Sequence, residues 1–236
     1  MPEWSPPQKA AEITEIRLQD AILDGTFPIN SHLPPERVLA EMLGVTRPTL
    51  REALQRLSRD GWIEIRHGKN TRVKNYMQEG NLLILNYLAK NPQAQPPSFV
   101  PDLLDVRATL APVFTRQALL RNPEAVCEHL DQMQEIPEDA REFSAADLEL
   151  QRVLTILSGN PIYTLILNGF AELYRVMGPF YFSSPAARER SRRFYFELRE
   201  AAEKRDAEAG ERLTREMMTE SIAIWKDARK QGEQAK

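Results

Sequence analysis

The sequence contains little cysteine and no long hydrophobic run. Cys127 is the only cysteine among 236 residues, so an intrachain disulfide is excluded and a reducing compartment is favoured. No apolar run is long enough for a membrane helix, and Met1–Pro7 does not have the basic and apolar segments of a signal peptide. We therefore expect a cytoplasmic protein that has no membrane partner.

The composition is that of an ordinary soluble protein. Charged residues make up 28% of the chain and hydrophobic residues 42%, and 236 residues are enough for two domains. The formal net charge is -3. A local excess of positive charge would therefore have to be concentrated in one segment.

The stretch Leu33–Val73 has the most informative pattern. A short helix over Pro35–Leu43 is predicted to end at Gly44, and a second helix is predicted to begin at the N-cap Thr46 and to end at Asp60-Gly61. The apolar residues of both helices recur at helical spacing: Val38, Leu39, Met42 and Leu43 in the first, and Leu50, Ala53, Leu54 and Leu57 in the second.

Two β-like runs follow the second helix. Trp62–Arg66, with Ile63 and Ile65 on one face, and Thr71–Lys74 have strand-forming residues, and Gly68 and Asn70 between them are typical of a turn. So short a hairpin must pack against the helices, which leaves His67 at an exposed tip that could reach a minor groove. The order helix, helix, hairpin is that of a winged helix-turn-helix, a DNA-binding unit, which we assign to residues 1–74.

Positive charge is concentrated in this unit. From Arg47 to Lys74 eight basic residues (Arg47, Arg51, Arg56, Arg59, Arg66, Lys69, Arg72 and Lys74) stand against three acidic ones. Arg47 and Arg51 flank the apolar stripe of the second helix, where guanidinium groups can reach guanine edges or phosphates, and Thr46 and Thr49 add hydroxyl groups. The alternative is that this arginine pair only forms a solvated face. The element order together with the basic excess favours DNA binding.

The remainder of the chain is predicted to be helical. Residues 8–24, with Ile13, Ile16 and Ile22 at near-helical spacing, should form a helix that packs under the second helix of the motif. We assign residues 75–81 to a linker and residues 82–236 to an all-α helical bundle. The candidate helices of the bundle are 101–120, 123–134, 144–157, 161–176, 186–204 and 207–230. The predicted fold class is therefore mainly α, with a small β-hairpin wing.

These residues also resemble a known family. Leu33–Arg37, Leu39-Ala40, Gly44–Arg47, Thr49–Leu54 and Leu57–Trp62 resemble the winged-helix domain of the GntR superfamily of bacterial repressors. Leu54–Leu57, Arg59–Trp62, His67–Lys69 and Ser158–Tyr163 are similar to its fatty-acid-responsive branch, and this likeness runs over nearly the whole chain. The resemblance implies a homodimeric regulator of fatty acid metabolism, which represses degradation and activates unsaturated fatty acid synthesis at other promoters.

The resemblance also implies how the dimer would bind. Two recognition helices related by a two-fold axis would meet a palindromic double-stranded operator. Pro48 departs from the Thr of the family, which removes a hydroxyl group. For Arg37 the alternative is an intramolecular ion pair, for example with an acid on the recognition helix. The candidate DNA-binding residues are Arg37, Thr46, Arg47, Thr49, Arg51, His67 and Gly68.

Many GntR regulators with a helical C-terminal domain share a metal site that is built from an Asp and three His. In this chain His129 is the only histidine after His67. One imidazole cannot assemble such a site, so we expect no metal and no cofactor.

The resemblance instead implies a long-chain fatty acyl-CoA as the effector. Such a ligand needs an apolar tunnel, cations for its phosphates and aromatic rings. The last helix has Thr214, Met218, Ser221 and Trp225 on one stripe, although Met218 and Met217 stand where the family has Gly and Tyr, which should narrow the pocket or shift the tail. The candidate ligand-binding residues are Arg107, Tyr174, Tyr181, Arg215, Met218, Glu220, Ser221 and Trp225. The alternative is a plain core stripe in which Trp225 is a packing anchor.

Three other functions remain open at this point: a regulator of the same superfamily with a different small-molecule effector, an enzyme that acts on acyl-CoA, and a helical interaction module without a ligand. An enzyme is disfavoured because Ser158-Gly159-Asn160 is not a Gly-Xaa-Ser-Xaa-Gly elbow and no nucleophile has a suitable histidine, so we expect no catalytic residues. If the protein is a regulator released from DNA by acyl-CoA, then acyl-CoA must bind more tightly to the conformation that does not bind DNA.

Overall fold

The computed structural model describes residues 10–66 and 68–234, with side chains described up to residue 226. The predicted minor-groove residue His67 therefore lies outside the described residues. The chain divides into two compact units, Met1–Ala94 and Gln95–Lys236.

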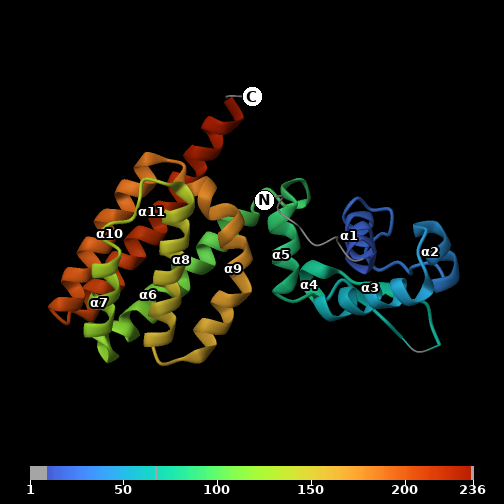
Figure 1. Ribbon diagram of the computed structural model, residues 1–236, viewed down its shortest axis with the longest axis horizontal. Coiled ribbons are helices and arrows are strands. Elements are labelled where there is room, and N and C mark those ends of the chain that lie inside the picture. Colours follow the sequence, from blue (N-terminus) through green and yellow to red (C-terminus); the bar gives the residue numbers. More distant parts are fainter. Residues whose placement is uncertain (1–9, 67, 235–236) are drawn as a thin grey trace, which may run out of the picture. The chain divides into compact units, whose positions relative to one another are not determined.

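The first unit is a winged helix-turn-helix, as predicted (Figure 1). Helices α1 and α2 both pack against α3, and β1 and β2 form the antiparallel wing. Its elements are α1 (Ala10–Leu23), α2 (Glu36–Leu43), α3 (Arg47–Asp60), β1 (Ile63–Glu64), β2 (Arg72–Val73), α4 (Tyr76–Glu79), α5 (Leu83–Lys90) and the 3₁₀ turn η1 (Pro92–Ala94).

The ends of α2 and α3 follow from local chemistry. Gly44 and Gly61 end the two helices in the left-handed conformation, with φ of 68° and 94°, where a side chain would be strained. Thr46 caps α3, because its Oγ1 accepts a hydrogen bond from the Thr49 backbone N–H at 3.3 Å. The connection from Gly44 to Thr46 therefore sets the direction in which α3 continues after α2.

The apolar pattern of α1 is only partly right. Ile13 and Ile16, predicted to face the core, are 37% and 40% exposed. The helix instead buries a face that includes Thr14 and Gln19. Ile65, predicted on the same face as Ile63, is 45% exposed because β1 ends at Glu64 and the alternation stops there.

The wing has a third segment that the sequence pattern did not predict. β1 pairs with β2 through Ile63 opposite Val73, and residues 30–33 run along the other edge of β2. The Asn30 N–H donates to the Val73 carbonyl and the Val73 N–H to the Ser31 carbonyl, both at 2.9 Å. The short hairpin is therefore held by a loop as well as by the helices.

Helix α5 is part of the first unit. The Trp62 ring is fully buried and lies 4.9 Å from the Tyr76 ring and 5.4 Å from the Tyr87 ring, measured between centroids. The Tyr87 hydroxyl also donates to Asp20 on α1. For this reason the division between the units falls after Ala94, later than the linker assigned to residues 75–81.

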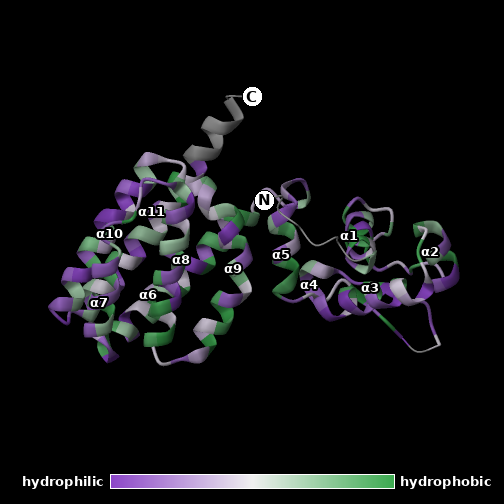
Figure 2. Ribbon diagram, in the orientation of Figure 1, coloured by the Kyte–Doolittle hydropathy of each residue, from purple (hydrophilic) through white to green (hydrophobic). Residues whose placement is uncertain are grey.

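The second unit is an all-helical bundle (Figure 1). Helix α6 packs along α11, α8 along α9, and α10 against both α7 and α11. Figure 2 shows hydrophilic and hydrophobic residues alternating along these helices, as amphipathic helices require. The helices are α6 (Phe99–Arg121), α7 (Pro123–Gln132), α8 (Ala140–Leu157), α9 (Pro161–Phe182), α10 (Pro185–Glu203) and α11 (Ala207–Gln234).

Helix α9 is longer than the sequence pattern predicted, because it continues through Pro179 to Phe182 instead of ending at Val176. A Cβ on Gly178 would lie 2.0 Å from Ser144 Oγ, so glycine is what lets α8 and α9 approach here. Within the described part of the chain, no helix combines the length and the apolar character needed to cross a bilayer.

Candidate DNA interface and ligand cavity

The first turns of α3 present two arginines to solvent. Both Arg47 and Arg51 are exposed. Arg51 Nε donates to Glu36 Oε2 of α2 at 2.7 Å, and the Arg51 side chain is still 65% exposed. Arg47 makes no ion pair with any residue in the described ranges. The Thr46 and Thr49 hydroxyls lie 2.8 Å apart beside them.

Arg37 forms the intramolecular ion pair considered above, with an acid of its own helix. Its Nη1 donates to Glu41 Oε1 at 3.0 Å, one turn along the same helix, and not to an acid of the recognition helix. Both side chains are 64% exposed, so the pair is weak and Arg37 can exchange it for a phosphate.

Much of the basic excess of this unit is neutralised internally. Besides Arg51, which donates to Glu36 at 2.7 Å, four of its arginines donate to acids of the same unit at 2.6–2.7 Å: Arg56 to Glu52, Arg59 to Asp60, Arg66 to Glu64 and Arg72 to Glu79. The hydrogen bonds that Arg56 and Arg59 donate to these carboxylates raise the pKa of both arginines. Five of the eight basic residues counted in the sequence are therefore paired with acids, whereas Arg47 has no ion pair within the described ranges and Lys69 is exposed beside Gly68 at the wing turn.

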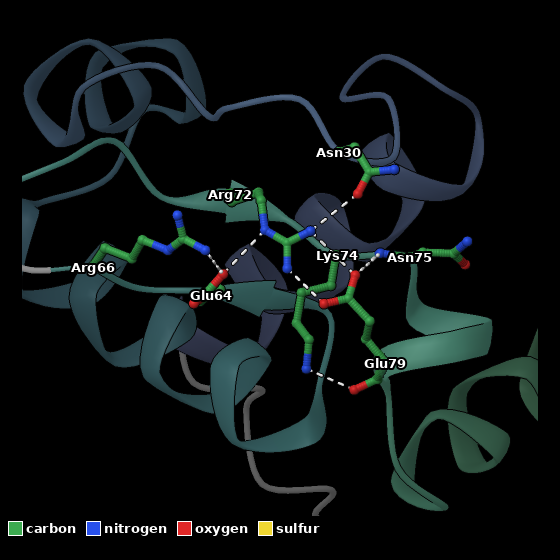
Figure 3. A network of polar contacts seen from close by, with 7 residues as sticks. All are labelled: Asn30, Glu64, Arg66, Arg72, Lys74, Asn75 and Glu79. Atoms are coloured by element: carbon green, nitrogen blue, oxygen red, sulfur yellow. Dashed lines mark hydrogen bonds and ion pairs between the residues drawn. The ribbon is translucent and has the colours of Figure 1, made fainter.

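Arg72 is the centre of a polar network that joins the wing to α4 (Figure 3). Its guanidinium binds Glu79 with two hydrogen bonds of 2.6 and 3.1 Å, Glu64 at 3.0 Å and Asn30 at 3.0 Å. The hydrogen bond from Arg66, followed by the one from Arg72, lowers the pKa of Glu64 to about 2. Sequence reasoning treated Arg72 only as a surface cation, although the hairpin register could have indicated its pairing with Glu64.

A cavity of about 120 Å³ lies among α6, α8, α9 and α11. Apolar and aromatic side chains form most of its lining. Five of the predicted ligand-binding residues lie on its wall: Arg107, Tyr174, Tyr181, Ser221 and Trp225.

The other three do not line it. Arg215 donates to Glu211 at 2.8 Å on the surface of α11, Glu220 forms an ion pair with Arg190 of α10, and Met218 is buried elsewhere. A helical stripe indicates which residues share a face, but it does not show which of them reach the cavity.

The polar wall of the cavity is centred on a buried ion pair. Arg107 Nη2 donates to Asp147 Oδ2 at 2.9 Å, and the Tyr195 hydroxyl donates to Asp147 Oδ1 at 3.0 Å. The Arg107 guanidinium also lies 5.0 Å from the centroid of the Tyr174 ring. Sequence reasoning missed Asp147 and Tyr195. The signal for Asp147 is an acid on the otherwise inward-facing stripe of α8.

These groups keep their charge states near neutral pH. Burial opposes the charged form of Arg107, but Tyr174 and Asp147 together favour it more strongly, and the pKa of Arg107 is raised. Burial raises the pKa of Tyr181 to about 12 and also raises that of Tyr195, so both phenols stay protonated. The cavity therefore offers a fixed cation and hydroxyl groups on an apolar wall.

Comparison with known proteins assigns both units. The model of the FadR C-terminal domain matches residues 74–235, and that of the bacterial regulatory proteins of the gntR family matches residues 10–73. The chain is a FadR-type member of the GntR family. It is 41% identical to the fatty acid metabolism regulator proteins of Yersinia enterocolitica and Pectobacterium carotovorum over 92% of this chain and 91% of each relative.

A solved structure has the same fold. Lar, which "controls the expression of the Listeria monocytogenes agr system", superposes with a TM-score of 0.53 at 18% identity, covering 93% of this chain and 98% of that one. FadR-type proteins are DNA-binding transcription regulators of fatty acid metabolism and not enzymes. In this FadR-type chain, the winged helix-turn-helix is the DNA-binding part, and the segment that contains the cavity matches the FadR C-terminal domain.

Proposed function

We propose that this regulator binds a palindromic operator as a homodimer and leaves it when a long-chain acyl-CoA fills the cavity of the helical unit. The observation that supports this most is the cavity itself, an apolar chamber with one buried arginine inside the segment similar to the FadR C-terminal domain. By its regulatory class, it represses fatty acid degradation and activates unsaturated fatty acid synthesis, and it acts in the cytoplasm.

The chemistry of the cavity fits the acyl part of such a ligand. Its apolar and aromatic lining would hold the hydrocarbon tail, while Arg107, Tyr181 and Trp225 offer polar atoms on the same wall. Arg215 and Glu220, on the outer part of α11, would act at the entrance toward the coenzyme A moiety, with Arg215 as a cation for a phosphate.

The size of the cavity suggests how binding would be signalled. Ligand pockets usually measure roughly 300–1,000 Å³, whereas this cavity measures about 120 Å³. A long acyl chain must therefore widen it by moving α6, α9 or α11. A ligand that binds only the widened arrangement shifts the population toward that arrangement, which is the condition for an effector.

On the DNA side, the proposed contacts are those of the exposed start of α3. Arg47 and Arg51 would enter the major groove, with Thr46 and Thr49 donating to the backbone and Arg37 reaching a phosphate from α2. Gly68, exposed at the wing turn with φ of 70°, would approach the minor groove together with His67.

An operator-shift titration with acyl-CoAs of several chain lengths tests the proposal. We expect long-chain thioesters to release the operator and free coenzyme A, the matched control, to leave it bound. Release by neither would exclude the acyl-CoA effector. If in addition no acyl-CoA raises the melting temperature of the protein, a different small-molecule effector becomes the better explanation.

A further inference from the structure

One side chain on the cavity wall has two polar atoms, and neither has a partner among the described residues. Gln151 of α8 lines the cavity, and its side chain is nearly inaccessible, with 1% exposure. Neither its Oε1 nor its Nε2 makes a hydrogen bond with any described residue. An amide buried in this way loses its bonds to water without replacement, so such groups are rare in native proteins unless something else binds them.

The neighbouring polar groups on the same helix face are satisfied. Asp147, one turn before Gln151, accepts from Arg107 and Tyr195. Thr155, one turn after it, accepts from Thr164 at 3.1 Å and donates to the Arg152 carbonyl at 2.8 Å. Missing partners are therefore not a general property of this face of α8. They occur at Gln151, the one of the three residues that lies on the cavity wall.

The chemistry of the amide indicates what would satisfy it. Nε2 donates and Oε1 accepts, so a group that both donates and accepts can use the two atoms at once. A hydroxyl group both donates and accepts, whereas a hydrocarbon chain does neither. Four more unpartnered polar atoms belong to residues of the same wall: Arg107 Nε, the Tyr174 and Tyr181 hydroxyls and Trp225 Nε1.

We propose that the cavity is selective for an acyl chain that carries a hydroxyl group, and that Gln151 is the residue that recognises this group. The inference rests on the proposed acyl-CoA effector and names a narrower ligand class for the same site. An unsubstituted chain of the same length would displace any water from the amide and leave both amide atoms unpaired.

Calorimetric titration of the full-length protein tests this selectivity. The probes are an unsubstituted long-chain acyl-CoA and acyl-CoAs of equal length with a single hydroxyl group at different positions along the chain. We expect one hydroxylated chain to bind roughly tenfold more tightly than the unsubstituted chain, as one net hydrogen bond to a buried amide would give. In Gln151→Met, which keeps the side-chain length, this preference should disappear.

Gln132→Met is the matched control, because Gln132 is an exposed glutamine on α7, and it should keep the preference. Equal affinity of the wild type for all chains would overturn the inference and leave the acyl-CoA effector intact. Retention of the preference in Gln151→Met would also overturn it. Failure of every acyl-CoA to bind would reject the proposed effector itself. The comparison of ligands on the wild type decides the question even if a variant does not fold.

Discussion

Replacing Arg51 by alanine separates a DNA-contacting side chain from a structural one. Its only ion pair within the described residues is with Glu36, and the two side chains are 65% and 41% exposed. An exposed pair of this kind stabilises a fold by about 0–1 kcal/mol. We therefore expect Arg51→Ala to leave the free energy of unfolding nearly unchanged.

The effect on DNA binding should be larger. Loss of a bidentate guanidinium contact to a base costs about 1–3 kcal/mol, which corresponds to a roughly 5- to 150-fold rise in the operator Kd. Arg59→Ala is the control, because Arg59 lies on the same helix, is 68% exposed and also pairs with an acid, Asp60, but at the far end of α3 from the proposed contacts.

Fluorescence anisotropy with labelled operator at several salt concentrations measures both effects. A base contact would relax sequence preference at one operator position, whereas a phosphate contact would reduce the salt slope by about 1. Wild-type operator affinity in Arg51→Ala would refute the proposal that α3 contacts the operator through Arg51. An equal loss of operator affinity in Arg59→Ala would refute it as well.

Three further predictions concern stability. Asp147→Ala leaves a buried guanidinium without its partner and should cost about 3–5 kcal/mol in urea unfolding, whereas a loss below 1 kcal/mol would mean that water reaches the site. Because the pKa of Glu64 is lowered to about 2, its stabilising contribution is complete above pH 4.5 and is lost as the pH falls toward 2, so Glu64→Gln should flatten this part of the pH–stability curve. A curve identical to that of the wild type would contradict the pairing of Glu64. Gly61→Ala should destabilise the protein by more than about 1 kcal/mol, since the φ of Gly61 is 94° and a Cβ would lie 2.8 Å from Gly80 Cα. Gly25→Ala is the control and should destabilise the protein less, because Gly25 has a φ of 82° but no atom within 4 Å of the added Cβ. Equal melting temperatures of the two variants would contradict this.

The fold could be predicted from the sequence where local chemistry decides it. Helix ends marked by Thr46, Gly44 and Gly61 are caps whose geometry depends on a few neighbouring residues, so they can be read from the chain. The end of α9 could not, because Pro179 normally stops a helix, whereas α9 continues through it to Phe182 and packs closely on α8 where Gly178 meets Ser144.

Side-chain partners were predicted less well for a related reason. An arginine counted as a free cation in the sequence is recognised as paired only when the fold brings its acid close, as Glu79 approaches Arg72. Periodicity likewise placed Ser221 and Trp225 on one face of α11, and both line the cavity, whereas Arg215 and Glu220 form ion pairs with other side chains. The direction of a helix face is a local property, but contact with a cavity depends on all the elements around it.

The most direct test is the affinity of the protein for a long-chain acyl-CoA, measured with and without saturating operator DNA. If the two sites are linked, operator DNA must weaken acyl-CoA binding by the same factor by which acyl-CoA weakens operator binding. We predict this reciprocal loss. Equal acyl-CoA affinity in the presence and absence of the operator would contradict the proposal that filling the cavity releases DNA.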